Sequence, residues 1–219
     1  MPISTASQAI RPDFDKNRPL LFVAAVFFII WVITLAGTTN FSNWMIENTL
    51  TVIFLSFLVL TYKTFRFSTL SYVFIAIYLS LHVYGSEYTY AENPFGYWLK
   101  SIFHLSRNHY DRIVHFSFGF MLAYPMRDYF MNKMKFPDWV CWTLPVEITL
   151  SFSCLYEMIE WVVADVFFPK EGDAYLGLQG DIWDSQKDMF MAFCGALTIT
   201  LVTLVIKKSF KRKRTRAGL

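Results

Sequence analysis

The sequence predicts an all-α membrane protein, a polytopic bundle of about six transmembrane helices with one amphipathic helix at the membrane surface. Three observations lead to this class. Of the 219 residues, 55% are hydrophobic and 19% aromatic, whereas 17% are charged, compared with about a quarter in soluble domains. Several apolar runs approach the length of about 20 residues that a helix needs to cross the hydrocarbon core. The charged residues gather between these runs and in the C-terminal tail.

Each apolar run predicts one transmembrane helix. In chain order, the runs cover residues 20–36, 50–62, 70–85, 113–126, 140–168 and 189–206. The second run is the shortest, and its flanks at Asn48, Thr49 and Tyr62 can extend it. The fifth run is longer than a bilayer requires, so we expect it to tilt or to extend beyond the bilayer. The first run is too long for the core of a signal peptide, and we expect it to be retained as a helix.

The lysine and arginine residues predict the orientation of this bundle. With six spans, fifteen of them fall on the side of the two termini and five on the other side. The positive-inside rule makes the side with fifteen cytoplasmic, so we expect both termini in the cytoplasm. We therefore predict a single membrane domain at 1–219, with a cytoplasmic segment at 1–19, the six-span bundle at 20–206 and a basic cytoplasmic tail at 207–219.

Composition and motifs narrow the classes of partner. The tail KKSFKRKRTR directly follows an apolar run, a position typical of contact with anionic lipid head groups rather than nucleic acid. No nucleic-acid module, glycine-rich phosphate loop, GxSxG or HExxH motif is present. The cysteines lie inside predicted spans without the spacing of a metal site, and we interpret them as packed thiols. We expect membrane lipids as partners, and the sequence leaves open a small-molecule or lipid-linked ligand.

The connection at residues 86–110 is long and predicts the surface helix. After the turn signal Asn93-Pro94, helical spacing places five apolar residues on one face: Phe95, Trp98, Leu99, Ile102 and Leu105. Another face carries basic residues: Lys100, His104 and Arg107. This pattern predicts an amphipathic helix at 95–105 that lies in the membrane interface. We favour an aromatic anchor as its role, and a lid over a nearby site is the alternative.

Titratable side chains converge near the outer ends of the last three predicted spans. Asp111 and His115 lie four residues apart, on one helix face. Two further acids, Glu157 and Glu160, fall in the outer half of the fifth span. The motif GDIWDSQKD precedes the last span, and in a helix three of its acids would share a face: Asp181, Asp184 and Asp188. One histidine and six carboxylates would therefore lie at one depth. In the first three spans we find only His82, so we expect these spans to pack and anchor.

Four stretches of this chain resemble a known family. The segments YTYAENPFGYWL, RNHYDRIVHFSFGF, YEMIEW and LGLQGDIWDSQKDM are similar to the YjdF-type bacterial inner-membrane proteins, a family without an established function. The resemblance covers residues 71–201 and implies a multi-pass protein of the bacterial inner (cytoplasmic) membrane.

A more distant resemblance is to VanZ-like proteins, which are linked to glycopeptide resistance. They share the order D-x3-H, a Glu on the next span, and D-x3-D ahead of G-A. The matching positions are Asp111, His115, Glu157, Asp184 and Asp188. Phe193 precedes Cys194-Gly195 where an asparagine near the glycine is expected, so antibiotic resistance is not transferred to this chain.

Two hypotheses explain the polar cluster. In the first, which we favour, the protein is not an enzyme, and the cluster binds a lipid head group or a cation, or locks the helices together. In the alternative, it is a metal-dependent membrane hydrolase or transferase that acts on a lipid or a lipid-linked cell-wall precursor. Carboxylates with one imidazole suit Mg²⁺, Mn²⁺, Fe or Zn²⁺. The expected ligands are Asp111, His115, Asp184 and Asp188, and the expected acid or base residues are His115, Glu157 and Glu160.

Simpler explanations exist for single members of this cluster. Asp181, after Gly180, could be the N-cap of a helix, and Asp111 could cap the fourth span in the same way. Glu160 could be solvated at the membrane interface. A shared site requires His115 to lie near Glu157 or Asp184. If basic side chains instead fill the space between the acids, the cluster is a closed ion-pair network; the candidates are Arg107, Arg112 and Lys187.

Overall fold

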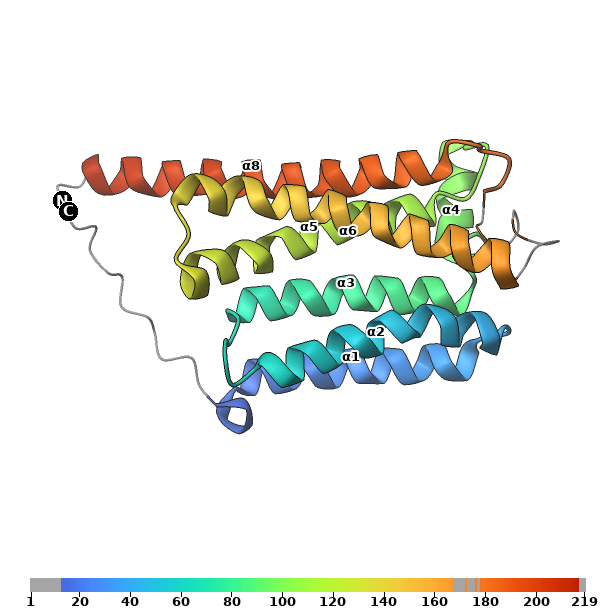
Figure 1. Ribbon diagram of the computed structural model, residues 1–219, viewed down its shortest axis with the longest axis horizontal. Helices are drawn as coiled ribbons and strands as arrows, with labels where there is room; N and C mark the ends of the chain where they lie inside the picture. Colours follow the sequence, from blue (N-terminus) through green and yellow to red (C-terminus); the bar gives the residue numbers. More distant parts are fainter. Residues whose placement is uncertain (1–12, 168–171, 173–175, 177, 217–219) are drawn as a thin grey trace.

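The computed structural model describes residues 13–167, 172, 176 and 178–216, without the side chains at positions 15 and 210–216. All regular structure in this part of the chain is helical, which confirms the predicted class. Six long helices run side by side along the molecule (Figure 1): α1 (Arg18–Gly37), α2 (Phe41–Thr61), α3 (Thr69–Glu87), α5 (Tyr110–Tyr129), α6 (Asp138–Phe167) and α8 (Asp184–Arg216). Three short helices complete the description: η1 (Phe14–Lys16), α4 (Pro94–Phe103) and the π-helix η2 (Phe130–Met134).

Each predicted span corresponds to one of the six long helices. Tyr62, the last residue of the second predicted span, follows the end of α2, and residue 168 lies outside the described residues. By length and composition, four of these helices are able to cross a membrane: α1, α2, α3 and α8 as far as Ser209. The other two, α5 and α6, have 20 and 30 residues and run beside them (Figure 1). On α1 and α2 many large apolar side chains are exposed, as expected for surfaces that contact lipid rather than water; examples are Phe22, Ile29, Val32, Val59 and Leu60.

Side-chain caps explain where several helices begin. The α2 helix begins at Phe41 rather than at residue 50 because the Asn40 side chain accepts a hydrogen bond from the Asn43 amide. In α4, the Asn93 side chain accepts from the Phe95 amide, and Pro94 occupies the first helical turn.

The predicted amphipathic helix is present as α4, at one end of the bundle (Figure 1). It ends two residues early because His104 adopts a left-handed conformation, with φ of 50°. Its exposed face is apolar and includes Trp98, Ile102 and Phe103. Arg107 was expected on the basic face of this helix, which is wrong, since Arg107 lies beyond the helix and is buried in the bundle.

An apolar core joins α1 and α3 to α5, and a polar junction joins the first three long helices to one another. The core cluster combines residues from α1, α3 and α5: Phe27, Ile75, Leu79, Val83 and Leu122. The polar junction centres on the buried side chain of Asn48 in α2. It accepts a hydrogen bond from the Trp31 indole (2.7 Å) and donates to the Ser86 hydroxyl (3.0 Å), so it links α1, α2 and α3.

Two glycines allow α5 and α8 to pack backbone against backbone. A Cβ atom at Gly119 would overlap the carbonyl oxygen of Ala192, and one at Gly195 would overlap that of Phe116. Small residues at such crossings are typical of helix pairs in membranes. Positions four apart on each helix form the facing stripes: Asp111, His115, Gly119 and Ala123 on α5, and Asp184, Asp188, Ala192 and Ala196 on α8. The close crossing therefore brings the polar ends of the two stripes together.

Candidate functional site

The polar residues meet at the end of the bundle that carries α4. Here α5 and α8 begin, and α3 and α6 end (Figure 1). The central group, which we name the histidine cluster, consists of Asp111 and His115 on α5, Glu157 on α6 and Asp188 on α8. His115, Glu157 and Asp188 are buried, and Asp111 is half-buried.

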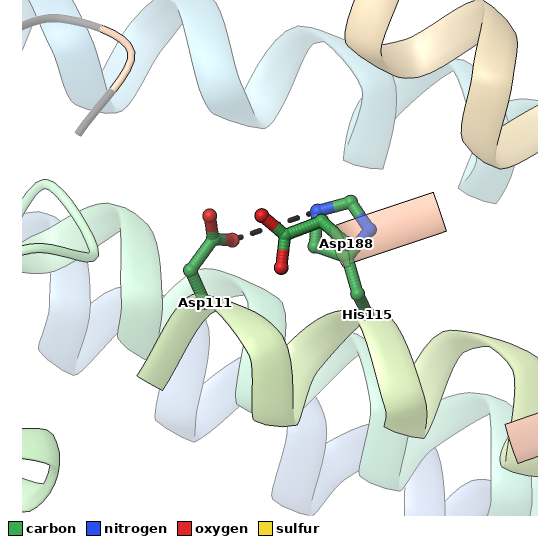
Figure 2. Close-up of side chains that lie close together, drawn as sticks. All are labelled: Asp111, His115 and Asp188. Carbon is green, nitrogen blue, oxygen red and sulfur yellow. Dashed lines mark ion pairs between the residues drawn. The ribbon is translucent and has the colours of Figure 1, made fainter. Parts of the chain in front are cut away.

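The side chains of the histidine cluster point toward one another. His115 Nε2 lies 3.5 Å from Asp111 Oδ1 and 3.3 Å from Glu157 Oε1. One ligand atom each from Asp111, His115 and Asp188 lies within 4.8 Å of the other two, and Figure 2 shows their polar atoms facing one another. Two ligand atoms that share one ion, at metal–ligand distances of about 2.0–2.6 Å, lie within roughly 5 Å of each other. The spacing therefore fits a single cation.

Two oxygens of this cluster lack a hydrogen-bond partner among the described residues. They are Glu157 Oε1 and Asp188 Oδ1, on residues that are 8% and 2% exposed. The 3.3 Å contact from His115 does not have hydrogen-bond geometry. The nearest described guanidinium, that of Arg112, has its Nε 3.9 Å from Asp188 Oδ1. Burying a carboxylate without compensation is costly, so these oxygens need either a cation or a proton.

The other acids of GDIWDSQKD belong to a separate arginine network. Arg107 donates to both oxygens of Asp184 (2.5 and 2.8 Å), and Arg112 bonds both Asp181 (2.6 Å) and Asp184 (3.0 Å). Lys187 completes the network on Asp181, at 2.6 Å. The closed ion-pair arrangement therefore holds for Asp181 and Asp184, whereas in the histidine cluster Asp188 is the one acid within 4 Å of a described arginine, with Arg112 Nε at 3.9 Å. Asp184, expected among the metal ligands, has both oxygens occupied by arginine.

Charges also act on titratable groups in the loops beside this network. The hydrogen bonds from Lys187 and Arg112 hold the pKa of Asp181 well below its usual range. Burial lowers the pKa of His109, and the neighbouring Arg112 and Arg107 add to this effect. The first shift favours the ionised form of Asp181, and the second favours the neutral form of His109.

The capping explanations do not hold for the two aspartates. The N-cap of α5 is His109, so Asp111 is already inside the helix, and it is the Asn108 side chain that accepts from the Tyr110 amide at that end. The last long helix begins at Asp184, not at Asp181. The Asp181 side chain instead accepts from the Trp183 amide, within the turn that leads into the helix.

Glu160 lies in a second polar group, where it meets a residue that sequence reasoning missed. A small cavity of about 20 Å³ beside the histidine cluster is lined by Glu47 of α2, Asp111 and Glu160, together with Asn43, Gln179 and the 89–91 loop. The expectation that the first three spans carry only His82 is wrong, because α2 begins early enough to include Glu47. The cap at Asn40 was the signal in the sequence that could have placed Glu47 inside a helix.

Tyr156 of α6 connects the two polar groups. Its hydroxyl donates to Glu47 Oε2 at 3.0 Å, and its ring packs edge-to-face against the imidazole of His115, with 5.9 Å between centroids. At the other nitrogen of the imidazole, His115 Nδ1 lies 3.5 Å from the hydroxyl of Ser153. These contacts orient the imidazole so that Nε2 faces the carboxylates.

The α4 helix contacts the loops that surround the site, and its Phe95 packs against Tyr110 at the start of α5. Gly96 of α4 packs against the Asn108 side chain, which also donates to the Asn93 carbonyl (2.9 Å). The backbone of Asn108 in turn exchanges hydrogen bonds with the Gln179 side chain (2.9 and 3.1 Å). The surface helix is thereby fastened to the loop ahead of α8, and a role as a lid stays a prediction.

Comparison with known proteins identifies relatives of the whole bundle. Residues 19–209 match a family described as "Predicted membrane protein (DUF2238)". The chain is 30% identical over 192 residues to the inner membrane protein YjdF of Escherichia coli (strain K12), which covers 84% of this chain and 89% of that protein. No solved structure matches the chain. The similarity to VanZ-like proteins finds no support in these comparisons, whereas the resemblance to the YjdF-type proteins is confirmed. This chain belongs to the DUF2238 family of predicted membrane proteins.

Proposed function

We propose that this membrane protein binds a divalent cation in the histidine cluster, with Asp111, His115, Glu157 and Asp188 as ligands. The observation that carries the proposal is the pair of buried oxygens without a hydrogen-bond partner, Glu157 Oε1 and Asp188 Oδ1. One ligand atom each from Asp111, His115 and Asp188 lies at spacings that fit one ion, and Glu157 Oε1 lies 3.3 Å from the Nε2 atom of the same imidazole. A bound cation would offset both the repulsion among three carboxylates and their loss of hydration.

The chemistry of these donors favours a transition metal. Mg²⁺ and Ca²⁺ prefer oxygen ligands alone, whereas imidazole suits zinc, iron and other late metals. One imidazole with three carboxylates therefore favours Mn²⁺, Fe²⁺ or Zn²⁺ over Mg²⁺. Asp184 is not part of this ligand set, because Arg107 and Arg112 bind both of its oxygens.

Hydrolysis or group transfer on a membrane lipid or a lipid-linked precursor is the second candidate function. One observation favours it over simple cation storage: a cavity next to the cluster is lined by Glu160, a group suited to general acid or base work. The exposed apolar face of α4 lies at the same end of the bundle, where a lipid substrate would arrive (Figure 1). A bound metal would polarise a phosphoryl or carbonyl oxygen or activate water.

We place this end of the bundle on the outer side of the bacterial inner membrane. The excess of basic residues at the opposite end supports this orientation through the positive-inside rule, and the inner-membrane relative supports the choice of membrane. A reporter fused after residue 219 and active only in the cytoplasm should be active, and the matching reporter active only outside should be inactive. The reverse pattern would overturn the orientation.

Metal analysis of the full chain purified in detergent tests the cation site. We expect at least about one Mn, Fe or Zn ion per protein chain, either after purification without chelator or after loading with metal and desalting. Asp188→Asn and His115→Ala should lose this metal, while Glu147→Gln on the exposed face of α6 should retain it. If the chain retains no metal after loading with each of the three ions, or if Asp188→Asn binds as much as the unaltered chain, the proposal is wrong.

A further inference from the structure

The cavity beside the histidine cluster has the composition of a second cation position. Three carboxylates from three helices line it, those of Glu47, Asp111 and Glu160. Its volume of about 20 Å³ is enough for one water-sized sphere. Asp111 lines this cavity and also contacts His115 at 3.5 Å, so one carboxylate borders both groups.

An unpartnered amide also lines this cavity. Asn43 is 9% exposed, and its Nδ2 atom has no hydrogen-bond partner among the described residues. The oxygen and nitrogen of such an amide are assigned from the hydrogen bonds around it. With the amide turned over, the carbonyl oxygen of Asn43 would occupy the place of Nδ2. Amide oxygens are ordinary ligands of hard cations, so Asn43 can add a neutral oxygen ligand beside the three carboxylates.

The balance of charge points in the same direction. The histidine cluster and the cavity together hold five carboxylates against one imidazole: Glu47, Asp111, Glu157, Glu160 and Asp188. Arg107, Arg112 and Lys187 bond Asp181 and Asp184 in the arginine network, and the Nε atom of Arg112 also lies 3.9 Å from Asp188 Oδ1. With all five carboxylates ionised, one divalent cation in the cluster would compensate two of the five negative charges. A second one would compensate two more, at the place where Glu47 and Glu160 lie.

We infer that the cavity is a second divalent-cation position, held by Glu47, Glu160 and Asp111 with the Asn43 amide, so that Asp111 bridges a two-cation centre. This inference rests on the proposed cation site in the histidine cluster. Tyr156 acts as a positioning residue for both ions, because it bonds Glu47 and packs against His115. Paired cations are the arrangement that proteins use to hold and polarise a phosphate group, so the ligand class we assign to the pair is a phosphate ester.

Titration of the chelator-stripped full chain with Mn²⁺ in detergent tests this inference, with bound metal and electron paramagnetic resonance as readouts. We expect two Mn²⁺ per chain and, at two equivalents, the spectrum of a spin-coupled pair. Glu47→Gln and Glu160→Gln should each bind one Mn²⁺ and show an uncoupled spectrum. Glu147→Gln, on the same helix as Glu160 but exposed, should still bind two. Asn43→Asp adds a charge to the cavity and should tighten the weaker Mn²⁺ by about tenfold, since the charge of the ligands tunes affinity.

The outcomes separate the two proposals. One Mn²⁺ per chain, unchanged in Glu47→Gln and Glu160→Gln and lost in Asp188→Asn, would overturn the second position and leave the cation site standing. Binding of no Mn²⁺, Fe²⁺ or Zn²⁺ would overturn both. If Glu47→Gln or Glu160→Gln fails to fold, Asn43→Asp decides, and unchanged Mn²⁺ affinity in this variant would count against the second position.

Discussion

His115 on α5 and Glu157 on α6 meet across a helix interface, with 3.3 Å between Nε2 and Oε1, yet Oε1 has no hydrogen-bond partner in the described part of the chain. Nearby in the bundle, Arg107 donates hydrogen bonds to both oxygens of Asp184. The same end of the bundle therefore contains one set of acids that is satisfied by arginine and one that is not. We assign stability to the first set and ligand binding to the second.

Arg107→Ala should destabilise the protein by about 3–5 kcal/mol, because it leaves Asp184 buried without its main partner. Arg107→Lys should restore only part of this loss, since an ammonium group cannot bond both oxygens as the guanidinium does. Lys187→Ala removes an exposed partner of Asp181 and should cost less than about 1 kcal/mol. Thermal unfolding in detergent measures all three, and equal stability of Arg107→Ala and Lys187→Ala would contradict the assignment.

The contribution of Asp181 to stability should depend on pH in a defined direction. Its pKa in the folded protein lies below its usual range because of Lys187 and Arg112. A carboxylate whose pKa is lower in the folded state stabilises the fold at pH values above its unfolded pKa of about 3.9. This stabilisation is lost as the pH falls from the unfolded pKa to the folded pKa. Asp181→Asn should therefore unfold at a lower temperature than the unaltered chain at pH 7. The difference between the two should shrink below about pH 4, and a difference that grows on acidification would count against these contacts.

Gly119→Ala should destabilise the pair of α5 and α8 by about 1–3 kcal/mol, because the added Cβ overlaps the Ala192 carbonyl oxygen. The sign is informative, since the same change at an unhindered helical position gains up to about 1 kcal/mol. Thr198→Ala, at an exposed position on α8, is the matched control and should be nearly neutral. A more stable Gly119→Ala, measured by thermal unfolding, would show that the helices are not in contact at this crossing.

Asn48→Ala should cost about 1–3 kcal/mol, because hydrogen bonds of this kind between membrane helices contribute about 0.6–1.7 kcal/mol each. The variant loses bonds to the Trp31 indole, the Trp44 carbonyl and the Ser86 hydroxyl. Thr49→Ala changes the next residue on the exposed face of α2 and should have little effect. Unfolding in detergent measures both variants. If they are equally stable, Asn48 does not join the first three helices.

Much of the fold follows from hydropathy alone. Each apolar run became one long helix, and the amphipathic spacing after Asn93-Pro94 became α4. The predicted start of α2 at residue 50 was wrong, because residues 41–49 are too polar to extend the apolar run. The sequence signal that the helix includes them is the cap at Asn40. Helix ends depend on single caps and on residues such as His104 that adopt a left-handed backbone, which hydropathy does not record.

The candidate site could be predicted only in part, for a different physical reason. Spacing four placed His115 with Asp111, and depth brought Glu157 and Asp188 to the same end. Depth does not say which acid meets which base, so Asp184 was grouped with the ligands although arginines hold it. The facing glycines Gly119 and Gly195 set the rotation of α5 against α8, and that contact is a property of two helices together.

The identity of the ligands is the central claim, and X-ray absorption at the metal edge tests it most directly. With Zn²⁺ bound at one equivalent, the spectrum should show one imidazole nitrogen among oxygen ligands, at distances of about 2.0–2.2 Å. In His115→Ala the imidazole signal should disappear. A shell of oxygen atoms alone in the unaltered protein, or an imidazole signal that persists in His115→Ala, would contradict the assignment of the histidine cluster as a metal site.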